Sequence, residues 1–314
     1  MNFKDFFNNL TKYNNDFNFS ILNNKTDNTS YSPTPEKDYK VFTNVKENLD
    51  YLKSKYNTLI CADVIIREFN MFVYNENHKC FIIYIDGLVD SDSINDFILE
   101  PLMLGKFRYN KPFEGTLFDY VDNCLLPQNS VTPVRDYSDV FTGINMGDCL
   151  LFIDTLDSAF DIDVKQYTQR SVSVPENESV IKGPQEGFIE NFRTNTSLLR
   201  RIVNNENLVI ETIPVGKISR TKCGVCYLQN IANGDLVSEV KYRLHNLDID
   251  SLLSTGELEQ FIEDDEGFGI PHVLSTERPD KCAKYLFQGR VVILVNGNPY
   301  ALILPATIED FLFS

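Results

Sequence analysis

The sequence predicts an α/β (mixed α+β) fold made of two similar subdomains, each with a small mixed sheet flanked by helices, joined by a long helix. First, helical and strand-like apolar patterns alternate along most of the chain. Second, residues 147–154 align without gaps onto residues 289–296, at an offset of 142 positions (289 minus 147). Third, an amphipathic stretch at residues 184–203 lies between these two copies, and we expect it to be the joining helix.

The predicted domain order starts with a leader. Residues 1–45 are rich in Asn, Ser, Thr and Pro, so we expect an Asn-rich segment that is mostly disordered. The first α/β subdomain is predicted at residues 46–165. The second is predicted at residues 166–314 and contains the motifs GPQEGF and TERPD.

Apolar spacing and turn residues predict the elements of the first subdomain. In order, they are a helix at 45–56, strands at 64–69 and 80–85, a helix at 94–102 capped by Ser91 or Ser93, and a strand at 149–153. The second subdomain repeats this order. Tyr84, at a strand end, corresponds to Tyr227 at an offset of 143 (227 minus 84). A near-constant offset over so much chain predicts an internal duplication.

The joining helix is expected to begin near Pro184, because proline and an acidic residue, here Glu186, are typical of a first helical turn. Asn195 lies on the apolar stripe of this helix, so its amide needs hydrogen-bond partners. The apolar residues predicted to share the buried face are Phe188, Phe192, Leu199 and Ile202.

The second subdomain has clear helix and turn signals. Pro279 and Gly289 bracket a short predicted helix, with proline at its start and glycine just past its end. Asn296-Gly297 is a tight-turn pair, so residues 291–295 and 300–304 are predicted to be paired antiparallel strands.

Composition excludes several classes of protein. The net charge is -16, and no basic patch is visible, which argues against nucleic acid as a partner. The seven cysteines are odd in number and lie mostly in apolar runs, as expected of buried thiols in a reducing compartment. The N-terminus lacks the apolar core of a signal peptide, and the longest uncharged apolar run is interrupted by the turn at residues 296–299.

The sequence predicts no catalytic residue, metal ion or cofactor. Cys223 and Cys226 form a Cys-x-x-Cys pair, but a zinc site needs four ligands, so buried packing on a strand is preferred. Gly183 to Gly187 lacks the Gly-Lys-Ser/Thr ending of a phosphate loop. Three histidines and no Gly-x-Ser-x-Gly leave a hydrolase unsupported. These residues therefore support no class of enzyme.

Two polar clusters remain as candidate sites. The first is on the joining helix and the second precedes the short helix at Pro279; their members are Glu186, Glu190, Arg193, Asn195, Arg200 and Arg201, and Thr276, Glu277, Arg278 and Asp280. One interpretation is an ion-pair network that ties the subdomains together, with arginines meeting acidic partners. The alternative is a small-ligand site at the subdomain junction, where an arginine fork holds a carboxylate.

These motifs resemble the signature of the GerA-type A subunits of bacterial spore germinant receptors. The resemblance covers about residue 49 to the end, and Arg290 of its last motifs joins the candidate residues. The segments that carry it include Tyr84 to Val89, Gln169 to Val172, Gly183 to Phe188, Leu198 to Arg201, Thr276 to Asp280, Gly289 to Val291 and Pro299 to Ile303. Lys182 and Gln185 depart from it, because the family commonly has arginine at both positions.

The resemblance implies a soluble N-terminal region that precedes membrane-spanning helices absent from this sequence. It implies a location on the cytoplasmic side of the spore inner membrane and partnership with B and C subunits. The resemblance implies a protein that is not an enzyme, and its expected function is signal transduction and subunit assembly in nutrient-induced germination. The alternative is a module that binds a small amino-acid-like germinant and closes at the subdomain junction.

Overall fold

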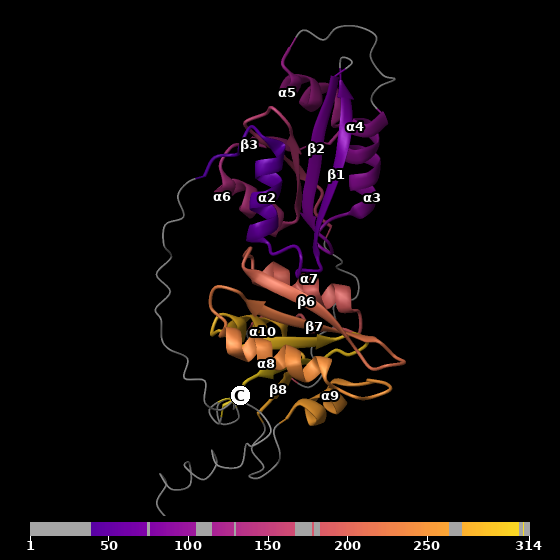
Figure 1. Cartoon of the computed structure of the whole chain (residues 1–314), viewed down its shortest axis with the longest axis vertical. Coiled ribbons are helices and arrows are strands. Elements are labelled where there is room, and N and C mark those ends of the chain that lie inside the picture. Colours follow the sequence, from indigo (N-terminus) through magenta and orange to yellow (C-terminus); the bar gives the residue numbers. More distant parts are fainter. Residues whose placement is uncertain are drawn as a thin grey trace, which may run out of the picture. The chain divides into compact units, whose positions relative to one another are not determined.

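The computed structural model describes residues 39–73, 76–104, 115–128, 130–166, 178, 183–263, 272–307 and 310. The predicted leader at residues 1–45 lies outside this set up to residue 38, as do Gln169 to Val172 and Lys182. The chain divides into two compact units (Figure 1). The first, here called the N-terminal unit, consists of the described residues of Pro33–Arg170 and Arg200–Leu208. The second, here called the C-terminal unit, consists of the described residues of Ser171–Leu199 and Val209–Ser314.

The N-terminal unit contains one five-stranded sheet in the order β1-β2-β4-β5-β3. Each of its strand pairs is antiparallel, where a mixed sheet was expected. Its elements are α2 (Val45–Lys55), β1 (Val64–Val73), β2 (Glu76–Ile85), α3 (Ser91–Ile94), η2 (Asn95–Leu99), α4 (Glu100–Leu104), α5 (Leu117–Tyr120), η4 (Val121–Leu125), β3 (Val131–Val134), α6 (Tyr137–Met146), β4 (Asp148–Ile153) and β5 (Ala159–Asp163).

The C-terminal unit contains a second five-stranded sheet, in the order β6-β7-β9-β10-β8. Its elements are β6 (Leu208–Val215), β7 (Thr221–Leu228), α8 (Gly234–His245), α9 (Thr255–Ile262), β8 (Leu274–Thr276), α10 (Pro279–Leu286), β9 (Val291–Val295) and β10 (Ala301–Leu304). Helix α7 (Phe192–Ile202) precedes them, and the division between the units falls after its residue Leu199. Because the two sheets share one strand order, the prediction of two similar α/β subdomains is confirmed.

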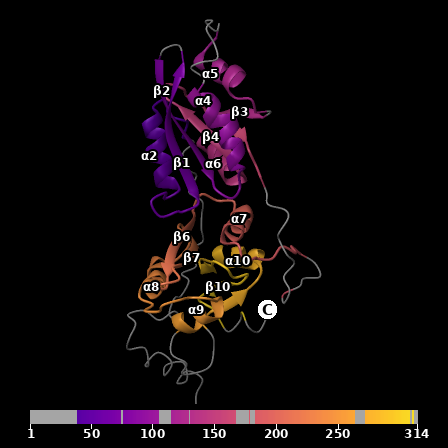
Figure 2. The same cartoon turned by 90° about the vertical axis from the view of Figure 1, so that its right-hand side faces the viewer.

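Apolar side chains cover both faces of the N-terminal sheet. Residues of α2 and α6 pack with one face, and residues of η2, α4 and η4 pack with the other (Figure 1). Strand β4 lies between them and is buried at all six positions. In the C-terminal unit, α8 and α9 pack on one face of the sheet, and Figure 2 shows α10 on the side opposite α8. A strand covered on both faces is mostly apolar, which explains the apolar runs at residues 149–153 of β4 and 291–295 of β9.

The aligned glycines Gly147 and Gly289 both have a left-handed backbone conformation. Gly147 follows α6 with φ 94°, and Gly289 follows α10 with φ 82°. A Cβ atom would lie 2.9 Å from the carbonyl oxygen of Leu88 at the first position and 3.0 Å from that of Ile231 at the second. Left-handed backbone and close approach favour glycine at both positions. Gly147 is the C-cap of α6, whereas Gly289 follows the Phe287 C-cap of α10 by two residues.

The joining helix is shorter than predicted. It begins at Phe192, whereas residues 183–191 contain no helix. The Phe188 amide donates to the carbonyl oxygen of Glu277 over 2.8 Å, so this backbone is bound elsewhere and Phe188 is buried outside the helix. Asn191 accepts from the amide of Thr194 over 3.0 Å and so stabilises the true first turn. The prediction of a helix from Pro184 was wrong, as was burial of Ile202, which is 38% exposed.

The helical segment after β2 also differs from its prediction. Asp90, not Ser91 or Ser93, caps it by accepting from the amide of Asp92 over 3.1 Å. The segment is divided into α3, η2 and α4, with a π-helical turn in η2. Pro101 in α4 has no amide hydrogen to donate to the preceding turn, which accounts for the wider turn before it.

The side chain of Asp161 on β5 packs closely against helix α6. A Cβ atom on Gly143 of α6 would lie 2.7 Å from its Oδ2, and among the described residues its Oδ1 has no hydrogen-bond partner. Burial raises the pKa of Asp161 to about 7, with nearby Asp148 raising it further and Lys165 opposing. The other charged groups that act on it are Asp163 and Asp139.

We predict that the stability of the N-terminal unit falls as pH rises from about 4 to about 7. In this window the unfolded chain has lost the Asp161 proton while the folded unit keeps it, so each rise in pH favours unfolding, by roughly 1–2 kcal/mol in total after allowing for solvent screening. Asp161→Asn should flatten this dependence in urea unfolding, whereas Asp96→Asn, at an exposed position of η2, should not. An unchanged pH dependence in Asp161→Asn would contradict the assignment.

Candidate functional site

The predicted site residues do not form one cluster. Arg200 belongs to the N-terminal unit, whereas Asn195, the Thr276–Asp280 motif and Arg290 belong to the C-terminal unit. Glu186 is partly buried, and Glu190, Arg193 and Arg201 are exposed. The prediction that they tie the two subdomains together stays a prediction.

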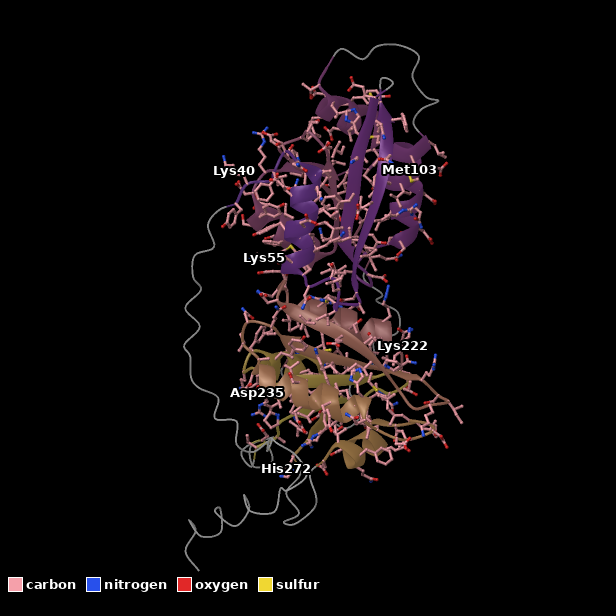
Figure 3. All side chains as sticks on the ribbon, in the orientation of Figure 1. Lys40, Lys55, Met103, Lys222, Asp235 and His272 are labelled. Carbon is pink, nitrogen blue, oxygen red and sulfur yellow. The ribbon has the colours of Figure 1, made fainter. Side chains whose placement is uncertain are left out.

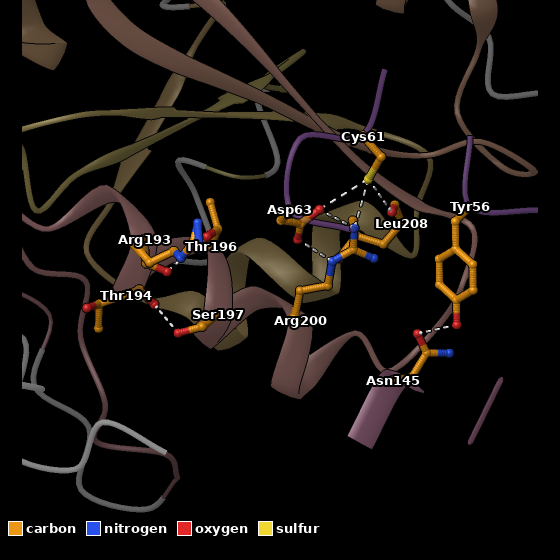
Figure 4. A network of polar contacts seen from close by, with 10 residues as sticks. All are labelled: Tyr56, Cys61, Asp63, Asn145, Arg193, Thr194, Thr196, Ser197, Arg200 and Leu208. Carbon is orange, nitrogen blue, oxygen red and sulfur yellow. Dashed lines mark hydrogen bonds and ion pairs between the residues drawn. The ribbon is translucent and has the colours of Figure 1, made fainter. Parts of the chain in front are cut away.

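Arg200 forms a buried ion pair with Asp63, a residue that directly precedes β1. Its Nε donates to Asp63 Oδ2 over 2.7 Å, and its Nη2 donates to Asp63 Oδ1 over 2.9 Å. Figure 4 shows the guanidinium turned toward Asp63 and Cys61, whose Sγ lies 3.0 Å from Nη2. The Cys61 thiol donates to Asp63 Oδ1 over 3.2 Å. This two-pronged geometry fixes both side chains.

The ion pair is almost completely removed from water. The side chains of Arg200 and Asp63 are 2% and 7% exposed. Burial alone lowers the pKa of Arg200, but the charge of Asp63 and its hydrogen bonds outweigh burial and raise that pKa. Nη1 of Arg200 has no hydrogen-bond acceptor among the described residues. Two desolvated charges of this kind depend on each other, because either one alone is costly to bury.

Tyr56 lies near the ion pair and stays neutral. Its hydroxyl donates to Asn145 Oδ1 over 3.3 Å (Figure 4). Burial, followed by the charge of Glu206, raises the pKa of Tyr56. Tyr56 and Cys61 are 1% and 3% exposed, so both side chains are shielded from solvent and belong to the packing around the ion pair.

Asn195 meets its predicted need for partners by binding the backbone of Ile189. Its Oδ1 accepts from the Ile189 amide over 2.8 Å, and its Nδ2 donates to the Ile189 carbonyl oxygen. Asn48 of α2 does the same to Phe42, six residues earlier, with distances of 2.9 and 2.6 Å. We call these contacts the asparagine clamps. Figure 4 also shows Thr196 bonded to the carbonyl oxygen of Arg193 in the same helix.

The TERPD motif surrounds the first turn of α10. Arg278 and Asp280 form a fork, with Nε to Oδ1 at 3.1 Å and Nη2 to Oδ2 at 2.6 Å. The hydrogen bonds that Arg278 donates to Asp280 raise the pKa of Arg278. Thr276 and Glu277 are buried and contact a residue absent from the predicted cluster, Glu178.

Arg290 completes a third arginine pair. It donates to Asp310 Oδ2 over 2.6 Å and to the Pro305 carbonyl oxygen over 2.9 Å, and its guanidinium lies 4.3 Å from the centre of the Tyr285 ring. Although burial opposes ionisation, hydrogen bonds from Arg290 and Thr307 lower the pKa of Asp310 to about 2.

The N-terminal unit has an ion pair at the position equivalent to Arg290. Asp148 aligns with Arg290 at the offset of 142 (290 minus 148). Lys165 Nζ lies 2.5 Å from Asp148 Oδ1. The two units therefore carry corresponding ion pairs of opposite polarity.

Sequence reasoning missed the acidic partners Asp63, Glu178 and Asp310. Asp63 had a usable signal, since it is a lone acid within the apolar run from Leu59 to Ile66 and must find a partner there. Glu178 belongs to the segment Pro175-Glu176-x-Glu178, which also carries the family resemblance. Neither Glu178 nor Asp310 could be paired from the sequence, because partners 98 and 20 residues away cannot be identified from spacing alone.

No catalytic or metal centre stands out in the described part of the chain. His272, labelled in Figure 3, uses its amide to bind Glu263, and His245 Nδ1 lies 2.8 Å from the Lys241 carbonyl oxygen. Among these residues no three His, Cys, Asp or Glu side chains form a possible metal site. An open hollow of about 530 Å³ between α2 and β1–β2 contains none of the predicted site residues. Within the same residues, no helix has the length and apolarity to span a bilayer.

Comparison with known proteins decides the family. The model of the Bacillus/Clostridium GerA spore germination protein family matches residues 50–314. The chain belongs to the GerA family. Spore germination protein B1 of Bacillus subtilis (strain 168) is 36% identical over 273 residues, which cover 87% of this chain and 54% of that protein. Spore germination protein KA of the same organism is 34% identical over 250 residues, covering 80% and 45%. This GerA chain therefore spans about half the length of these relatives.

A solved structure extends the GerA assignment to a domain. The N-terminal domain of the A subunit of the Bacillus megaterium spore germinant receptor GerK3 is 28% identical, with a TM-score of 0.62. The match covers 87% of this chain and 98% of that domain. The predicted resemblance to the N-terminal domain of a GerA-type A subunit is confirmed.

We predict that Asp63→Asn destabilises the N-terminal unit by about 3–5 kcal/mol, because it leaves the buried Arg200 charge uncompensated. The double variant Asp63→Leu/Arg200→Met should lose less than the sum of its single changes. Urea unfolding followed by circular dichroism measures both. Glu68→Gln, in the exposed pair with Lys53, is the matched control and should cost well under 1 kcal/mol. A loss in Asp63→Asn as small as in this control would contradict the prediction.

Proposed function

We propose that this region transmits the germination signal and helps to assemble the receptor, and that it does so without catalysis. Its partners are the B and C subunits, and its location is the cytoplasmic side of the spore inner membrane. The membrane connection is made by helices outside this sequence. Membership of the GerA family and similarity to an A-subunit N-terminal domain support this proposal.

One observation carries the proposal. Three of the arginines predicted as ligand-binding residues bind carboxylates of this chain, as Arg200–Asp63, Arg278–Asp280 and Arg290–Asp310. An arginine bound in this way has little left to offer a ligand, whereas it makes its unit stiffer. A domain that transmits a signal needs rigid elements, because energetic coupling between two sites is carried by elements with discrete arrangements.

A panel of amino acids distinguishes a region that only transmits the signal from one that binds the germinant itself. We expect the melting temperature of the chain to stay unchanged with millimolar amino acids, because a module that binds none of them gains no stability from mass action. A concentration-dependent rise with one amino acid would support the germinant-binding alternative instead.

A second test uses the full-length A subunit in spores. We predict that Arg200→Ala lowers both the amount of B and C subunits that copurify with it and the rate of germination, because the N-terminal unit loses its buried ion pair. The neighbouring change Arg201→Ala, at an exposed position, should leave both near wild type. Normal copurification and germination in Arg200→Ala, with the unit shown to be unfolded, would overturn the proposal.

A further inference from the structure

Three donors around the start of α10 hold one carboxylate. Oε2 of Glu178 accepts from the Thr276 hydroxyl and from the Glu277 amide, the latter over 3.2 Å. Oε1 accepts from Lys281 Nζ over 2.9 Å. The donors come from residues 98 to 103 positions later in the chain, and all belong to the C-terminal unit with Glu178. We call Thr276, the Glu277 amide and Lys281 the carboxylate cradle.

Packing and backbone contacts hold two of the three donors of the cradle in place. Thr276 and Glu277 are only 1% and 6% exposed, so their positions are set by packing. Pro279 holds Arg278 in an extended conformation, and the Arg278 amide donates to Thr276 Oγ1 over 3.2 Å. Because Oγ1 accepts this bond, its own hydrogen is directed to the carboxylate. The first turn of α10 adds favourable potential for an anion.

The N-terminal unit shows that the fold does not require this cradle. The Val41 amide donates to the Arg135 carbonyl oxygen, and the Phe188 amide donates to that of Glu277, both over 2.8 Å. Arg135 and Glu277 are thus equivalent, at the offset of 142 (277 minus 135).

At the same offset, the N-terminal unit has other residues in place of both side-chain donors of the cradle. It places Val134 at the position of Thr276 (276 minus 134) and Asp139 at that of Lys281 (281 minus 139). Valine offers no hydroxyl and aspartate repels a carboxylate, yet α6 follows β3 as α10 follows β8. The donors are therefore an addition to the C-terminal unit.

We propose that the carboxylate cradle is a recognition site for small monocarboxylates, occupied in this structure by Glu178 of the same chain. Both oxygens are recognised, one by two hydrogen bonds and one by an ammonium group, which is the pattern expected for a bound carboxylate. Because Glu178 is tethered, an outside carboxylate competes with an effective concentration in the millimolar range. This inference rests on the geometry of the C-terminal unit and is independent of the proposed relay.

The test empties the cradle and refills it with acetate. In Glu178→Ala, sodium acetate should raise the melting temperature in a saturable manner, compared with sodium chloride at equal ionic strength. Wild type should not respond over the same range. Glu178→Ala/Thr276→Val, which gives the cradle the residue of the N-terminal unit, should lose the response.

Glu211→Ala is the matched control in the same unit. Glu211 and Lys241 form an ion pair with side chains 22% and 23% exposed, close to the 27% and 17% of Glu178 and Lys281. In Glu211→Ala, Lys241 keeps the Tyr227 hydroxyl, 3.4 Å from its Nζ, as a neighbour. This pair does not reproduce the hydroxyl, backbone amide and ammonium donors of the carboxylate cradle, so acetate should restore little stability.

A second measurement keeps the test decisive. The amide resonance of Glu277 in Glu178→Ala should shift with acetate and not with chloride. Should this variant fail to fold in chloride, the yield of folded chain after refolding in acetate replaces the melting temperature. Equal acetate effects in all variants, or none in Glu178→Ala, would overturn the proposal.

Discussion

The asparagine clamps set the geometry on which both units depend. In each, a buried amide on the first helix binds both backbone groups of the residue six positions earlier. In the described part of the chain, neither Phe42 nor Ile189 lies in a strand. The side chain of the asparagine therefore makes the backbone hydrogen bonds that a neighbouring strand would otherwise make. The chain entering the unit is thereby fixed beside the helix, and Val41 and Phe188, each one residue before the clamped position, bond to the loop that precedes α6 or α10.

Much of the fold could be predicted from the sequence because its signals are local. The glycines at 147 and 289 and the turn at Asn296-Gly297 mark helix and hairpin ends by backbone conformation alone, and the structure shows positive φ at all three glycine positions. The internal offset then predicted that the units would share one strand order, which the two sheets confirm.

The sequence failed where distant groups compete with local ones. Pro184 and Glu186 satisfy the local rules for a helix start, but Glu277 and Asn195 take the backbone groups that such a helix would need. The site was harder still. Arg200 and Asp63 are separated by 137 positions, and no spacing rule pairs them. The sequence could single out the arginines as candidate site residues, but it could not identify the carboxylates that bind them, because these are brought near only by the tertiary structure.

The reversed ion pairs limit how the two units can be recombined. Asp148 binds Lys165 in one unit, and Arg290 binds Asp310 in the other, with Asp148 and Arg290 8% and 13% exposed. A chimaera that exchanged residues 148–153 with residues 290–295 would set Asp148 against Asp310 and Arg290 against Lys165. Like charges at such shielded positions are strongly unfavourable. Although the two units share a topology, the charges at these aligned positions are opposite. A segment can therefore be exchanged between the units only together with the residue that forms its ion pair.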